Sequence, residues 1–89
     1  MPKVVLTERF VDDASDIWSD RVLDRTLRTV RTLENFPLIG STDIPPSVIR
    51  EFGTNVCKCV IAPFDVTYEY DEQNDVVYVY GLIPCSQAH

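Results

Sequence analysis

An apolar stripe with helical spacing lies near the middle of the chain and restricts the possible folds more than any other feature. Its members are Val22, Leu23, Leu27, Val30 and Leu33. They recur at roughly 3.6-residue spacing and therefore share one face of a helix. Ser19 precedes the stripe as a potential N-cap. The helix is expected to end near Asn35, because Pro37 restricts the residue before it and Gly40 favours a loop.

The last third of the sequence changes from helical spacing to short β-branched and aromatic runs. Three of these runs are expected to be strands, at residues 55–62, 64–70 and 76–83. Residues 72–75 supply a hairpin turn. Pro63 separates the first two runs, because proline lacks the N–H that a central strand needs. Consecutive strands joined in this way predict an antiparallel meander.

The N-terminal residues add a strand and a second helix. Residues 3–7 form a short β-branched run, which predicts a first strand. Asp12, Asp13 and Asp16 then suit the first turns of a helix, where the helix dipole favours negative charge. The apolar face of this helix would consist of Phe10, Ala14, Ile17 and Trp18.

The segment between the helices and the strands is a long loop at residues 41–53, in which Pro45 and Pro46 favour an extended path. Residues 47–52 suit either one helical turn or a short strand. The order of elements predicts an α+β domain with an N-terminal strand, a helical hairpin and a three-stranded antiparallel meander. A chain of 89 residues holds one domain, and we expect that domain to span residues 1–89.

Charge is distributed unevenly along the chain. Fourteen acidic residues and eight Lys or Arg residues give a formal net charge of −6, which argues against a general attraction to phosphate backbones. Four of the cations occupy one segment, as Arg21, Arg25, Arg28 and Arg31. Beyond Lys58 the chain contains acidic residues but no Lys or Arg.

The cysteines indicate a reducing compartment. Cys57, Cys59 and Cys85 are an odd number, and the N-terminus lacks the pattern of a signal peptide. We therefore expect free thiols and a cytoplasmic protein. No apolar run approaches the ~20 residues that span a bilayer, so no membrane association is expected.

Several stretches resemble the RelE/ParE family of bacterial toxins. Residues 33–40 (LENFPLIG) are similar to the Leu-x-x-x-Pro-x-x-Gly sequence that leaves the second helix of these proteins. Residues 48–52 (VIREF) are similar to their "LREL" element, and residues 64–71 and 75–83 resemble their last two strands. The resemblance covers nearly the whole chain and is strongest from Leu33 onward. It implies the toxin component of a type II toxin–antitoxin pair, whose antitoxin binds the groove around the helices and the sheet edge.

The departures from the family pattern concern its catalytic residues. Many members end the last strand in His-x-x-Arg, where this chain has Pro84 and Gln87. Ribonuclease members also carry Arg and Lys on the central strands to stabilise charge on the RNA backbone, whereas Arg50 and Lys58 are the only cations here. The resemblance therefore implies the ParE-like branch, which inhibits DNA gyrase, or an inactive homologue. Two alternatives stay open. One is a ribosome-dependent mRNA endoribonuclease of RelE type, in which Arg50 and Lys58 hold phosphate and His89 transfers protons; the other is a non-toxic protein-interaction domain.

The arginine row is the candidate partner-binding site. Arg21, Arg25, Arg28 and Arg31 lie along one face of the predicted helix. There they are suited to contact an acidic antitoxin segment or nucleic acid. The alternative is a solvated face whose charges pair with Asp24 and Glu34.

The remaining candidates have plain structural alternatives. Cys57 and Cys59 face one side of a strand and, with Cys85, suit a three-thiolate metal site, but buried cysteines commonly fill space. For His89 the alternative is a frayed chain end without a function. The tyrosines form two aromatic rows, one of which is expected to face the core: Tyr68, Tyr70, Tyr78 and Tyr80.

We expect no cofactor and no resident metal. The expected partners are an antitoxin protein and, as a cellular target, DNA gyrase or the ribosome. The sequence leaves a homodimer open.

Overall fold

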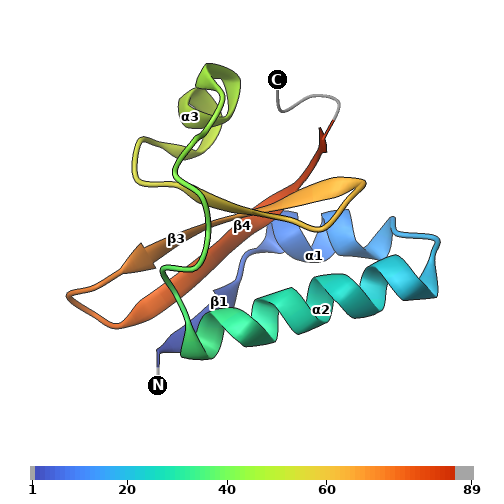
Figure 1. Ribbon diagram of the computed structural model, residues 1–89, viewed down its shortest axis with the longest axis horizontal. Helices are drawn as coiled ribbons and strands as arrows, with labels where there is room; N and C mark the ends of the chain where they lie inside the picture. Colours follow the sequence, from blue (N-terminus) through green and yellow to red (C-terminus); the bar gives the residue numbers. More distant parts are fainter. Residues whose placement is uncertain (1, 86–89) are drawn as a thin grey trace.

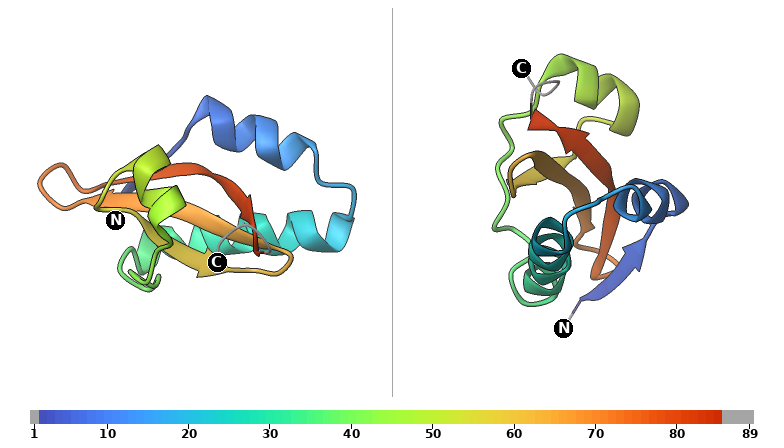
Figure 2. Two further views of the ribbon diagram at one scale, coloured as in Figure 1. Left: turned by 90° about the horizontal axis from the view of Figure 1, so that it is seen from above. Right: turned by 90° about the vertical axis from the view of Figure 1, so that its right-hand side faces the viewer.

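The computed structural model describes residues 2–85 and contains a four-stranded sheet with two longer helices on one face and a short helix on the other (Figures 1 and 2). In chain order the elements are β1 (Lys3–Leu6), α1 (Glu8–Ser15), α2 (Asp20–Asn35), α3 (Pro46–Phe52), β2 (Cys57–Val60), β3 (Phe64–Asp71) and β4 (Val76–Pro84). Within the described residues, every helix is too short or too polar to cross a membrane.

The sheet has the strand order β1-β4-β3-β2. β2 pairs with β3 and β3 with β4, both antiparallel, so the predicted meander is confirmed. β1 pairs in parallel with the first half of β4, in register from Lys3 opposite Val76 to Leu6 opposite Val79. The central positions of β3 and β4 explain why these two strands hold most of the buried sheet residues.

The helix α1 begins earlier than its acidic residues suggested. Thr7 is its N-cap, because the Thr7 side chain accepts a hydrogen bond from the Phe10 N–H at 3.2 Å. Asp12 and Asp13 consequently lie in its second half and Asp16 is its C-cap, so the expectation that these acids occupy the first turns was wrong. The Thr7 hydroxyl also bonds a backbone carbonyl of β4, which fixes the start of α1 at the end of β1.

The apolar face predicted for α1 is only partly correct. Phe10 is buried, and Ala14 and Ile17 pack against the core from partly buried positions. Trp18 lies beyond the helix in the connection to α2 and its surface is 98% exposed. The helix ends at Ser15, so helical spacing does not extend to Trp18.

The helix α2 has the predicted ends. The Val22 N–H donates to the Ser19 side chain at 3.3 Å, and the helix stops at Asn35. Its buried residues are Thr26, Val30 and Leu33. Leu27, which we expected in the apolar stripe, is 46% exposed. Thr26 is buried instead. Its hydroxyl donates to the Val22 carbonyl within the helix, so burial leaves this polar group with a partner.

The main core lies between the helical hairpin and one face of the sheet. Its buried residues are Phe10, Val30, Leu33, Ile61, Val66, Tyr68, Val77, Val79 and Leu82. Tyr68 pairs across the strands with Val79, and Tyr70 pairs with Val77. The first tyrosine row therefore faces the hairpin together with the valines of β4, whereas Tyr78 and Tyr80 point to the opposite face.

A bulge in β4 changes which residues enter the core. Thr67 pairs with Gly81 and Tyr68 with Val79, so Tyr80 is an extra residue in β4. The inward alternation consequently shifts by one position, and Leu82 rather than Gly81 joins the main core. The run at residues 76–83 gave no sign of this shift apart from a glycine inside a strand pattern.

The helix α1 also covers the edge of β4 where β1 stops. β1 ends opposite Val79. Further along β4, the Leu82 N–H donates to the Asp13 carboxylate at 3.0 Å instead of to another strand. The Leu82 N–H is covered by α1 and therefore needs an acceptor within the protein. Asp13 of α1 is that acceptor.

The segment at residues 47–52 is helical. α3 has Pro46 in its first turn, where the missing N–H of proline costs nothing, and its C-cap is Gly53, whose φ is +102°. Val48, Val56 and Ile83 form a second, smaller core beneath it. α3 therefore covers the end of the sheet face that points away from the hairpin (Figure 2).

Substituting Leu33 should test the main core. Leu33→Ala should lower the free energy of unfolding by about 2–5 kcal/mol, because a fully buried leucine leaves a cavity. Leu27→Ala, on the same helix but half exposed, is the matched control and should cost under about 1 kcal/mol. Urea unfolding followed by circular dichroism measures both. Equal losses for the two variants would contradict this arrangement of α2.

Candidate partner-binding site

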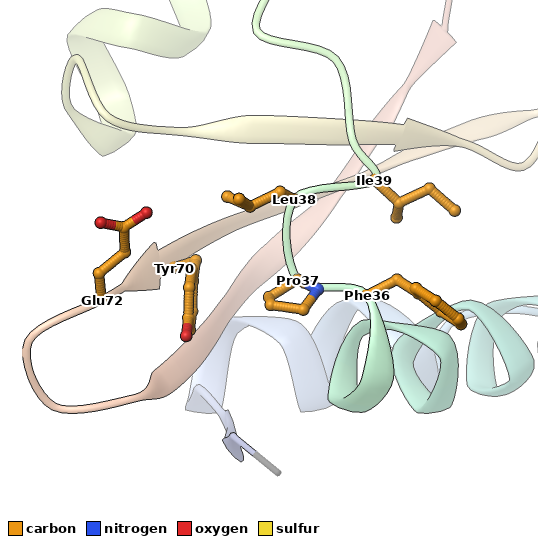
Figure 3. A pocket seen from close by; sticks show the side chains of 6 residues that line it. All are labelled: Phe36, Pro37, Leu38, Ile39, Tyr70 and Glu72. Carbon is orange, nitrogen blue, oxygen red and sulfur yellow. The ribbon is translucent and has the colours of Figure 1, made fainter.

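Exposed apolar side chains gather in the loop that leaves α2. Phe36, Leu38 and Ile39 are 62%, 68% and 60% exposed. With Pro37, and with Tyr70 and Glu72 of the β3–β4 hairpin, they line an open cleft of about 580 Å³ (Figure 3). We call this surface the loop cleft. Large apolar side chains that cluster on the surface mark a site of interaction more often than isolated ones do.

The loop is held against the sheet by backbone contacts behind the cleft. The Gly40 N–H donates to the hydroxyl of the buried Tyr68 at 2.8 Å. Ser41 and Lys58 form a β-bridge in which each N–H donates to the carbonyl of the other, at 2.8 and 2.9 Å. A side chain on Gly40 would collide with the Tyr68 hydroxyl and would lie 2.8 Å from the Lys58 carbonyl oxygen. Only glycine allows this approach, so the position of the loop against the sheet depends on Gly40.

The polar residues beside the loop cleft are acidic. Glu72 lines it directly. In the same hairpin, the Asp71 carboxylate accepts hydrogen bonds from Asn74, which lower the Asp71 pKa. The Tyr70 hydroxyl donates to Asp75 at 2.6 Å, and this hydrogen bond raises the Tyr70 pKa. The hairpin therefore presents negative charge at one wall of an apolar cleft.

The arginine row lies on the solvent side of α2, and all four guanidinium groups belong to exposed residues. Arg28 pairs with Asp24 at 3.0 Å, which matches the charge pairing considered for this face. Arg25 reaches the connection between β2 and β3 and donates to the Ile61 carbonyl at 3.2 Å. The role of the row in binding a partner stays a prediction.

Two of the three catalytic candidates, Arg50 and Lys58, belong to α3 and to the sheet face that α3 covers. Lys58 is half-buried on β2 and pairs across the sheet with the buried Thr67, while Arg50 is exposed on α3. Asp65 and Glu69 share the strand face of Thr67, because side chains two apart on a strand point the same way. Among the described residues, the ion pairs with carboxylates include neither Arg50 nor Lys58. His89 lies outside the described residues.

An ion pair connects the two sides of the fold. The Arg9 guanidinium of α1 bonds the Glu51 carboxylate of α3 and lies 3.3 Å from Asp13. It also lies 5.3 Å from the centre of the Phe52 ring, which stacks on Tyr80. Hydrogen bonding to Glu51 raises the Arg9 pKa. These contacts attach α3 to the end of the sheet.

The three cysteines do not converge on one point. Cys57 and Cys59 pack against the main core, and burial raises the pKa of both thiols. Cys85, at the end of β4, donates to Asp65, which belongs to the opposite face. Over residues 2–85, the side chains of His, Cys, Asp and Glu do not form a group suited to a metal ion.

The sequence reasoning missed the loop cleft as a site. We used Phe36, Leu38 and Ile39 only as part of a family motif. Three large apolar residues between a helix end and a glycine are a signal, since such a short loop has little depth in which to bury them. Nothing in the sequence indicated that Tyr70 and Glu72 line the same cleft, because these two residues are distant in sequence from the loop after α2.

The chain was compared with known proteins. It matches no protein-family profile, and no curated protein sequence matches it. By structure, it is similar to a chain in the crystal structure of the toxin–antitoxin complex RelBE2 from Mycobacterium tuberculosis. The TM-score is 0.72 with 17% sequence identity, and the match covers 94% of this chain and 99% of that chain. The predicted RelE/ParE-like fold is therefore confirmed as a fold.

Substituting Tyr68 should test whether its hydroxyl holds the loop after α2 through the hydrogen bond from the Gly40 N–H. Burial raises the Tyr68 pKa above its ordinary value near 10. The unfolded chain therefore loses this proton first, and above about pH 10 stability should fall by about 1.4 kcal/mol per pH unit for this group. Tyr68→Phe should make that alkaline loss less steep. At neutral pH it should cost about 1–3 kcal/mol, because the Gly40 N–H loses its partner.

Urea unfolding of both proteins across this pH range measures the difference. The thiols of Cys57 and Cys59 also contribute to the alkaline loss, because burial raises the pKa of both, and hydrogen bonding to Tyr68 partly offsets that rise. Both proteins are therefore compared with Cys57 and Cys59 replaced by alanine, so that the difference isolates Tyr68. Parallel stability curves for the two proteins would contradict the buried hydroxyl.

Proposed function

We propose that this protein is a toxin, or a toxin-like homologue, of a bacterial type II toxin–antitoxin system, and that an antitoxin binds it. The proposal is supported by the structural likeness of this protein to a chain of a toxin–antitoxin complex, which extends over nearly the full length of both chains. The motif of residues 33–40 adds support, because its glycine fits a tight backbone approach at Gly40.

The antitoxin is proposed to bind along α2 and the adjoining sheet edge. This surface offers exposed apolar residues at the loop cleft and the arginine row on the helix. A partner segment that crosses the arginine row would be acidic there, because guanidinium groups form strong paired hydrogen bonds with carboxylates. An extended or helical tail can use both features at once.

The proposed action is inhibition of DNA gyrase, or no toxic action, rather than cleavage of RNA. An RNA-cleaving site needs positive charge to stabilise the developing charge on phosphate. On the sheet face beneath α3, Lys58 lies among Asp65 and Glu69, and Arg50 is exposed on the helix. Two acids beside one lysine disfavour a bound phosphate.

Pulse labelling of DNA and protein synthesis, immediately after tightly controlled expression of this chain in bacteria, tests the proposed action. A gyrase inhibitor should stop DNA synthesis first, and an inactive homologue should affect neither. A rapid fall in protein synthesis would instead support the ribonuclease alternative. In that case Arg50→Gln combined with Lys58→Gln should abolish the effect; Arg21→Gln combined with Arg31→Gln is the control, because it removes the same charge from α2.

Co-expression with the product of the adjacent small reading frame tests the partner. We expect the two proteins to purify together. If expression of this chain alone is toxic, we also expect co-expression to restore growth. A product that neither binds nor neutralises the chain would count against the proposal.

A further inference from the structure

We infer that the loop cleft binds a cationic amphipathic segment of the partner, with apolar side chains against Phe36, Leu38 and Ile39 and a Lys or Arg beside Glu72. This inference rests on the proposed function and specifies the chemistry of the partner. It concerns a different part of the partner from the acidic stretch proposed for the arginine row.

The apolar part of the inference follows from exposure and shape. The three side chains stand outward on a loop whose backbone is fixed by Tyr68 and by the Ser41 bridge. Because the loop is held from behind, the cleft is already formed before a partner binds. A preformed apolar surface avoids the entropy cost of ordering a loop on binding, and its water is released when apolar side chains cover it.

The charge of the occupant follows from the surroundings of the cleft. Glu72 is the charged residue that lines it, and the same hairpin carries Asp71 and Asp75. From Val76 to Cys85 no cation balances them. Lys3, which lies beside this hairpin because its strand pairs with Val76, is the one nearby cation from β1. Glu72 is exposed, and the ion pairs of the described residues do not include it, so its charge is available to a partner.

Two other occupants fit the charge less well. A second copy of this chain would bring a further net charge of −6 to an acidic hairpin, and like charges at an interface oppose association. Nucleic acid would place phosphate beside Glu72 and would meet the same repulsion. A cationic peptide segment is the occupant that satisfies both the apolar wall and the acidic wall.

Selection from a random peptide library displayed on phage, against the purified whole chain, tests the inference. The selected peptides should combine Leu, Ile or Phe with Lys or Arg, and their binding should weaken as salt is raised. Synthetic copies are then measured by fluorescence anisotropy against three variants. Leu38→Asp should weaken binding by about tenfold or more, because it places a charge against apolar side chains.

Glu72→Lys should weaken binding by about threefold to tenfold and reduce its salt dependence, since an exposed ion pair is replaced by repulsion. The matched control is Asp16→Lys, which makes the same charge change at the opposite end of the helical hairpin and should change the affinity less than twofold (Figure 1). Selection of acidic peptides, selection of none, or equal effects of the two lysine variants would overturn the inference.

Binding measurements with the antitoxin distinguish a failure of this inference from a failure of the proposed function. If the product of the adjacent reading frame binds wild type, Leu38→Asp and Glu72→Lys with one affinity, the toxin–antitoxin proposal stands and the role of the loop cleft fails. If no antitoxin exists but cationic peptides bind as described, the proposed function fails and the cleft chemistry stands.

Discussion

The hydrogen bond from the Gly40 N–H to the buried Tyr68 hydroxyl is the contact on which the functional surface depends. A tyrosine enclosed in a core must give its hydroxyl a partner, and here the partner belongs to the loop after α2. The bond places Gly40 so close to the sheet that Ser41 pairs with Lys58 on the edge strand. The preceding apolar residues are left facing solvent. The loop cleft is thus a consequence of how the main core closes.

The helix α1 has a comparable influence at the other end of the sheet. Thr7 and Asp13 bond the backbone of β4 where no strand continues the sheet, so a helix completes the sheet edge. Arg9 then reaches α3 on the far face through Glu51 and Phe52. The molecule consequently presents two surfaces of different character. One is apolar with an acidic wall beside α2, and the other is the sheet face under α3, where Lys58 lies beside Asp65 and Glu69.

The agreement between sequence and structure was good where local physics decides the outcome. α2 begins directly after the Ser19 cap and ends at Asn35, because a cap and a downstream proline act within a few residues. Agreement was poor where packing decides. Leu27 and Thr26 are adjacent and both fit a helix, yet the contact with the sheet buried the threonine and exposed the leucine. The sequence up to Trp18 was compatible with a longer α1. In the structure α1 ends at Ser15, and Trp18 lies in the connection to α2.

The sequence by itself determined the α+β class, the helical hairpin, the meander and an acidic C-terminal third, because periodicity, caps, turns and net charge are local or additive properties. The tertiary structure alone decided which tyrosine row is buried, where β4 bulges, and that Tyr70 and Glu72 complete a cleft with Phe36, Leu38 and Ile39. These outcomes depend on contacts between residues far apart in the chain. Such contacts form only when one face of the sheet closes on the helices, and no local pattern encodes them.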